Sequence, residues 1–267
     1  MTASTEDAPG ASAPPDARRA GRELVLEVVF RPLSNVLVPI FAGLRISPPT
    51  VVLANAATGV VAALVLARGE LAWAAVLLQA KTLLDNCDGQ LARATGRVTL
   101  TGRYLDTIAD LVVNACFFMA LAIVTGQPLL ALAAFVALTL ILAADFNVTE
   151  LYREANGRPT PQPLATGACA ERILESIYAV VFVPLDQLAR GLASRRFEGR
   201  GGYDSFTVSA LANLGLSTQL LVLGICLVLD VPRLYLWFVL ACLAALVPLQ
   251  LRAERRASQT APRSASR

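Results

Sequence analysis

Four aspartates, Asp85, Asp88, Asp106 and Asp110, are the residues of this chain whose types and spacing best suggest chemistry. On helices, Asp85 and Asp88 lie one turn apart, and Asp106 and Asp110 share a face in the same way. Two such helices facing each other would bring four carboxylates into one small volume. Carboxylates in a partly desolvated pocket repel one another and need cations or protons to be tolerated. The spacing therefore predicts a cation-binding site.

The available ligands favour a hard divalent cation. All-oxygen ligands suit Mg²⁺ or Mn²⁺ rather than zinc, and two such ions would offset a formal charge of about −4. A two-metal carboxylate site suits phosphoryl chemistry, because the ions can hold a phosphate and stabilise the attacking and leaving oxygens. Arg93 adds a permanent cation whose planar fork fits phosphate. The chain has no histidine, which removes the commonest general base and any histidine-ligated metal site.

The elements that must position these residues are membrane helices. The chain has 267 residues, of which 55% are hydrophobic and 16% charged, whereas soluble domains are usually about a quarter charged. Its net charge of +3 is too small to indicate a nucleic-acid partner. The five cysteines show no metal or redox spacing. We expect an all-α polytopic membrane protein that has membrane lipids around it and binds no nucleic acid.

Six segments are long and apolar enough to span a bilayer, which requires about 20 mostly apolar residues. They cover residues 50–67, 71–95, 102–124, 129–152, 206–229 and 234–251. The second and third carry the aspartates at facing ends, beside the turn at 96–101. In the first span, Asn55 and Gly59 are interpreted as close-packing residues. Lys81 lies four residues before Asp85 and is either a snorkelling residue or a partner of the site.

Two further segments are expected to lie flat at the membrane surface. In residues 22–45, charged and apolar residues alternate and Pro32 interrupts the run, which is typical of an interfacial amphipathic helix. In residues 171–190 the uncharged stretch is only about ten residues and contains Pro184, which is short for a span. The loop over 153–205 that contains this second segment has no assigned role.

The composition of the chain ends predicts how the chain is divided into parts, and the arginines predict its orientation in the membrane. The first residues are rich in Ala, Pro, Ser and Asp without an apolar run, which indicates a disordered tail and not a signal peptide. With six spans, the arginine-rich loops and flanks all fall on one side, so the positive-inside rule places both termini and the aspartates in the cytoplasm. We expect a protein integral to the cell (inner) membrane. Its predicted parts are a tail over 1–21, a membrane domain over 22–252 and a cytoplasmic tail over 253–267.

The aspartates belong to a longer pattern that resembles the signature of the CDP-alcohol phosphatidyltransferases, D-x2-D-G-x2-A-R-x8-G-x3-D-x3-D. The motif covers residues 85–110, and the membrane pattern extends the resemblance over roughly residues 30–252. Fixed identities separated by fixed gaps are far more specific than a lone glycine motif. Every fixed position is met, by Asp85, Asp88, Gly89, Ala92, Arg93, Gly102, Asp106 and Asp110.

The resemblance implies a membrane enzyme of phospholipid biosynthesis. Such an enzyme moves a substituted phosphate group from a CDP-linked lipid such as CDP-diacylglycerol to an alcohol acceptor and releases CMP. The first candidate for the transferred group is phosphatidyl. The resemblance also implies a homodimer, two metal ions on the four aspartates, and Asp110 as the base that deprotonates the acceptor. The CDP site would be formed by Gly89, Ala92, Arg93 and Gly102.

Two other classes of function stay open at this stage. An intramembrane Mg²⁺-dependent prenyltransferase also uses aspartates on a diphosphate, although it would be expected to have two separated motifs and more spans. An ion-coupled transporter would be expected to place its acidic residues near the membrane midplane, in broken or repeated helices. The motif does not identify the acceptor, which could be glycerol 3-phosphate, inositol phosphate, serine or another lipid. The chain has Pro48-Pro49 where many relatives have Pro-Asn, and this difference bears on the same question.

Overall fold

The computed structural model describes residues 21, 23–156, 163–165, 167, 171–180, 183, 187 and 203–260. These residues are helical almost throughout and contain no β-strand, so the predicted all-α class is confirmed. Residues 171–180 form a helical segment without a label. The labelled helices are the π-helix η2 (Leu26–Phe30), α1 (Arg31–Gly43), α2 (Pro48–Ala67), α3 (Leu71–Ala94), α4 (Leu100–Thr125), α5 (Pro128–Ala155), α7 (Ser205–Ala212), α8 (Leu216–Val228) and α9 (Pro232–Thr260).

Six stretches of the described chain are long and apolar enough to cross a membrane, which confirms a polytopic membrane protein. The set differs from the predicted six in one member, because it contains Leu26–Gly43 and lacks α3. The reason is chemical: Lys81, Asp85 and Asp88 interrupt the apolar run of α3. The qualifying stretches are Leu26–Gly43, Pro48–Ala67, Leu100–Thr125, Pro128–Ala155, Ser205–Val228 and Pro232–Ala253.

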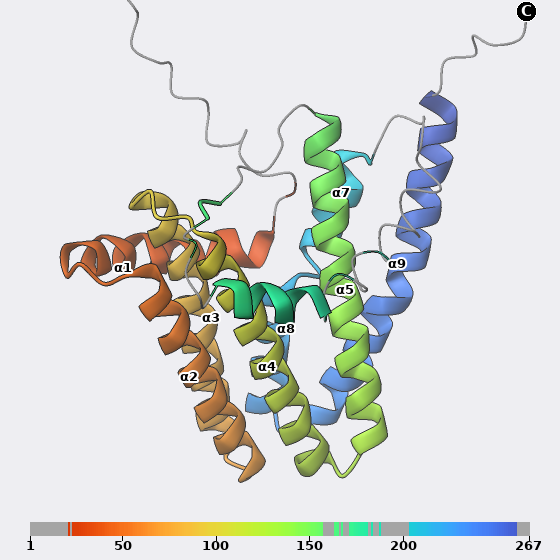
Figure 1. Cartoon of the computed structure of the whole chain (residues 1–267). Coiled ribbons are helices and arrows are strands. Elements are labelled where there is room, and N and C mark those ends of the chain that lie inside the picture. Colours follow the sequence, from red (N-terminus) through yellow and green to blue (C-terminus); the bar gives the residue numbers. More distant parts are fainter. Residues whose placement is uncertain are drawn as a thin grey trace, which may run out of the picture.

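The helices of the bundle differ in direction from two helical segments that lie across it. In Figure 1, α2, α3, α4, α5 and α9 run roughly along one direction, whereas α1 lies across that direction at one end of the bundle. The helical segment of residues 171–180, drawn in teal, also lies across α4 and α5. This arrangement fits the expected interfacial positions of both flat segments and keeps α3 within the bundle. Most of residues 181–190, like residues 1–20 and 261–267, lie outside the described part of the chain.

Local sequence explains where the helices that carry the site begin and end. Pro48 occupies the first position of α2, where its missing N–H costs nothing. At the start of α4, the Thr99 side chain accepts a hydrogen bond from the backbone N–H of Gly102 at 3.1 Å and so caps the helix. Gly126 ends α4 with a φ of +66°, which side chains disfavour, and Pro128 starts α5. At the far end, α9 continues to Thr260, so residues 253–260 of the predicted C-terminal tail are helical.

The helices pack through aliphatic cores and a few specific polar contacts. Leu78 of α3, Leu121 of α4 and Leu223 of α8 are among the buried residues of the main core. Between α3 and α8, Gln79 Nε2 donates to the carbonyl of Leu220 at 3.1 Å. A Cβ at Gly224 would collide with the Gln79 amide, so this glycine makes room for the contact. Such a hydrogen bond between helices is typical of membrane bundles and fixes α3 despite its charges.

Helix α1 covers the part of α3 that carries the motif. Val38 of α1 belongs to a second core cluster with Val51 of α2 and with Cys87 and Leu91 of α3. Cys87 stands between the first two aspartates in sequence and is fully buried in this cluster. Helix α1 therefore packs against Cys87 and Leu91 of α3, within the stretch that carries the motif.

Candidate active site

The aspartates lie where α3 ends and α4 begins, on either side of the turn that joins these helices. Asp85, Asp88 and Asp106 each contribute one carboxylate oxygen to a group in which all three atoms lie within 4.8 Å of one another. The helical spacing read from the sequence thus brings three of the four carboxylates together. Their role as metal ligands remains a prediction.

The hydrogen bonding of this group fits a divalent cation. Asp88 Oδ2 and Asp106 Oδ1 are buried and have no hydrogen-bond partner among the described residues. Buried carboxylate oxygens without a partner are costly in free energy, and a cation is the group that would satisfy both at once. An all-carboxylate site also matches the oxygen ligands that Mg²⁺ and Mn²⁺ prefer.

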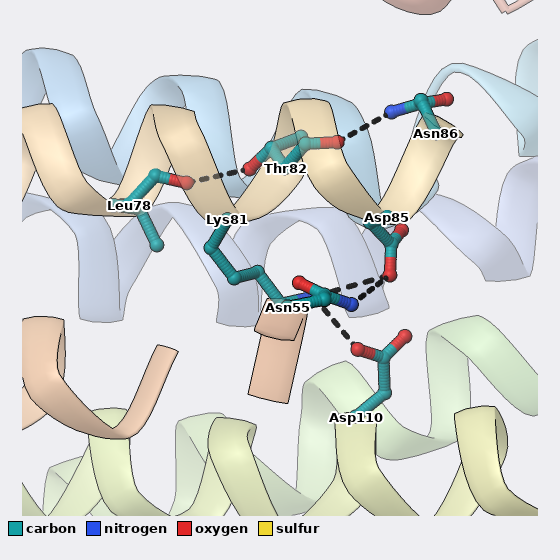
Figure 2. Close-up of polar contacts among 7 residues, drawn as sticks. All are labelled: Asn55, Leu78, Lys81, Thr82, Asp85, Asn86 and Asp110. Atoms are coloured by element: carbon teal, nitrogen blue, oxygen red, sulfur yellow. Dashed lines mark hydrogen bonds and ion pairs between the residues drawn. The ribbon is translucent and has the colours of Figure 1, made fainter. Parts of the chain in front are cut away.

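Asp110 is outside this group of three and pairs with Lys81. Its Oδ1 accepts a hydrogen bond from Lys81 Nζ at 2.7 Å, and the same Nζ lies 3.4 Å from Asp85 Oδ1. Lys81 is fully buried. Figure 2 shows its side chain reaching from α3 toward the Asp85 and Asp110 carboxylates. The sequence left two roles open for Lys81, a snorkelling residue or a partner of the site, and the structure favours the second.

Asn55 of α2 is a site residue that the sequence interpretation missed. Its Nδ2 donates to Asp85 Oδ1 at 2.9 Å, while its own Oδ1 is buried without a hydrogen-bond partner among the described residues. The available signal was a polar amide in an otherwise apolar span, since such a group needs a partner within the bilayer. Asp85 is therefore held by side chains from both α2 and α3.

Gly59 has the packing role expected from the sequence, with a consequence for the site. A Cβ at this position would collide with the Val113 side chain of α4 and lie 3.3 Å from Lys81 Cγ. The glycine therefore lets α2 and α4 approach each other and leaves space for the stem of the lysine.

Gly59→Ala should destabilise the protein by about 1–3 kcal/mol, the usual cost of adding a methyl group to a tightly packed interior. The measurement is thermal unfolding in detergent. Gly43→Ala is a matched control, because a Cβ there meets nothing within 4 Å. Equal melting temperatures for the two variants would contradict the close packing at Gly59.

The predicted nucleotide-binding residues lie next to the carboxylate group. A Cβ at Gly89 would lie 3.3 Å from Arg93 Nη1, so the guanidinium folds back over the glycine. Ala92 is half-buried on the same helix, and Gly102 is half-buried in the first turn of α4. Their positions on both sides of the turn are suited to one ligand, and their role in binding CDP remains a prediction.

Part of the long segment after α5 packs against the same turn. Leu164 accepts from the N–H of Leu100 and donates to the carbonyl of Val98, both at 3.0 Å. Thr101 Oγ1 lies 3.2 Å from Glu171 Oε2 and donates to it. The described parts of this segment therefore pack beside the start of α4. The sequence did not predict this contact.

Comparisons with known proteins identify the family of the chain. The model of the CDP-alcohol phosphatidyltransferase family matches residues 45–193, a range that contains all eight motif residues. The phosphatidylinositol phosphate synthase of Streptomyces avermitilis is 31% identical over 161 residues, which cover 57% of this chain and 64% of that protein. The chain thus spans less than two thirds of the relative's length. Because the family match takes in more than half of the chain, the chain belongs to the CDP-alcohol phosphatidyltransferase family.

Proposed function

We propose that the protein transfers a substituted phosphate group from a CDP-linked lipid such as CDP-diacylglycerol to an acceptor alcohol and releases CMP. The first candidate for the transferred group is phosphatidyl. The observation that carries this proposal is the group of Asp85, Asp88 and Asp106 near one end of the helix bundle, in which Asp88 Oδ2 and Asp106 Oδ1 are buried without a hydrogen-bond partner among the described residues. An amphiphilic donor suits that position, because its nucleotide can stay in water while its acyl chains stay in the bilayer. Family membership disfavours the prenyltransferase and transporter alternatives.

Asp85, Asp88 and Asp106 would hold a divalent cation, Mg²⁺ or Mn²⁺, and the sequence-based expectation of two ions adds Asp110 as a ligand. A bound metal ion would supply charge stabilisation to the donor's phosphate oxygens and to the departing phosphate. Arg93 would bind the same phosphates through its guanidinium. The missing side chain of Gly89 would let the nucleotide approach the backbone of α3.

Asp110 would remove the proton from the acceptor hydroxyl. The hydroxyl oxygen then forms a bond to the phosphorus that carries the lipid, while the bond from that phosphorus to the CMP oxygen breaks and CMP leaves with the electron pair. Lys81 holds Asp110 through Oδ1, and the proton would go to the other carboxylate oxygen, Oδ2. The contact with Lys81 would thus orient the base.

The acceptor we place first is an inositol phosphate, because the similar Streptomyces protein is a phosphatidylinositol phosphate synthase. The test incubates purified protein with Mn²⁺, CDP-diacylglycerol and inositol phosphate, glycerol 3-phosphate or serine, and measures CMP. We expect metal-dependent CMP release that one acceptor raises above the level without acceptor. Absence of release with every acceptor, under Mn²⁺ and under Mg²⁺, would contradict the proposed transfer.

We further propose that both termini and the carboxylates face the cytoplasm and that the protein is a homodimer in the cell (inner) membrane. The support for the orientation is the arginine distribution around the six predicted spans.

A cysteine placed at Ser264 in a cysteine-free variant should resist an impermeant thiol reagent in sealed, right-side-out cells. A cysteine at Gln127, in the turn between α4 and α5, should react and serves as the matched control. Labelling at position 264 together with protection at 127 would reverse the assigned orientation.

A further inference from the structure

We propose that the ammonium of Lys81 occupies the second cation position of this site. The protein would then bind one divalent ion at Asp85, Asp88 and Asp106 and use Lys81 in place of a second ion between Asp85 and Asp110. This inference rests on the proposed function and narrows its metal requirement from two ions to one.

The distances show why an ion and the lysine would compete. Lys81 Nζ lies 2.7 Å from Asp110 Oδ1 and 3.4 Å from Asp85 Oδ1, so it bridges the two carboxylates. An ion bound by the same two oxygens would lie about 2.0–2.1 Å from each for Mg²⁺. Those positions overlap with the ammonium, and both groups are positively charged. Either the lysine leaves or the second ion does not bind.

The surroundings keep the lysine in place. Its side chain is 1% exposed, and its stem lies in the space left by Gly59. An ammonium that lost both carboxylates without reaching water would be an unpaired buried charge, which is strongly unfavourable. Asn55 also holds Asp85 Oδ1 from the side of α2, so the carboxylate cannot follow an incoming ion without breaking that hydrogen bond.

The choice of residue and the local charge agree with this role. Lys81 is the one lysine in the sequence, and every other basic residue is arginine. An ammonium is a compact point charge, whereas a guanidinium is broad and planar, so lysine is the basic side chain that fits a position of ionic size. Lys81, Arg93 and one divalent ion together would offset the formal charge of about −4 on four carboxylates.

The first test counts the ions bound by the full-length wild-type protein in detergent. Mn²⁺ alone is titrated by calorimetry, and the bound Mn²⁺ is examined by electron paramagnetic resonance. We expect one Mn²⁺ per chain with the spectrum of an isolated ion. Two Mn²⁺ per chain, with the spin coupling of a pair about 3.5–4 Å apart, would overturn the role of Lys81 and leave the proposed transferase intact. No binding of Mn²⁺ would count against the metal site itself and thus against both proposals.

The second test removes the ammonium. Lys81→Gln should admit a second Mn²⁺ and show the coupled spectrum, whereas Lys81→Arg, which keeps the charge, should retain one ion. Asn86→Ala is the control on the same helix, because its side chain donates to the Thr82 carbonyl on the face of α3 away from Asp110 (Figure 2), and it should also bind one ion. One ion in both Lys81→Gln and wild type would overturn the proposal. If Lys81→Gln aggregates in size-exclusion chromatography, the number of Mn²⁺ ions bound by the wild-type protein decides the question on its own.

Discussion

Asp106→Asn and Asp85→Asn should each abolish measurable CMP release while leaving the protein in the membrane. Asparagine keeps the size of aspartate but lacks the charge that a metal ligand supplies. The expected loss is at least about 10²–10³-fold, the usual result of removing one preorganised electrostatic group from an active site. CMP release is measured at saturating Mg²⁺. Activity close to wild type in either variant would rule out the assigned ligands.

The two variants should differ in their stability without metal. Asp106 Oδ1 is buried and has no partner among the described residues, so its replacement removes a repulsive charge, and Asp106→Asn should melt at or above the wild-type temperature in EDTA. Asp85 accepts from both Asn55 and Lys81, so Asp85→Asn should melt lower. Thr107→Ala is a suitable control on α4, because the Thr107 hydroxyl donates to the carbonyl of Arg103 in its own helix.

Asp110→Asn should lower kcat by about 10²–10⁴-fold, the usual contribution of a positioned general base. Metal-dependent binding of the donor should largely survive, because Asp110 Oδ1 is paired with Lys81 and lies outside the group of three carboxylates. The deciding experiment pairs donor binding by calorimetry with turnover at saturating acceptor. Equal losses in binding and turnover would make Asp110 a plain metal ligand and would also argue against Lys81 as a substitute cation.

Much of the fold could be predicted because the bilayer imposes length and apolarity on each spanning helix. Pro48 and Gly126 also mark helix ends through backbone chemistry that is local to the sequence. Apolarity alone does not show which of α1 and α3 belongs to the bundle. Helix α1 is apolar enough to span a membrane but lies across the bundle (Figure 1), whereas the less apolar α3 runs within it. Charges that a site requires make a spanning helix resemble a surface helix in composition.

The site could be predicted only in part, because a sequence pattern describes one helix at a time. Helical periodicity shows which residues share a face, and it correctly grouped Asp85 with Asp88. It gives no information about how neighbouring helices are rotated against each other. The contacts of Asn55 with Asp85 and of Lys81 with Asp110 depend on that rotation and join residues 30 and 29 positions apart.

The anchoring of α3 also bears on how the protein is made. A charged residue near the centre of a helix costs roughly 2.5–3.5 kcal/mol during insertion by the translocon, and Lys81 lies near the middle of α3. One partner of the polar groups on α3, Asn55 on α2, is translated before α3, whereas Asp110 on α4 and the Leu220 carbonyl that accepts from Gln79 are translated after it. The full set of contacts that holds α3 can therefore form only after α4 and α8 have been translated.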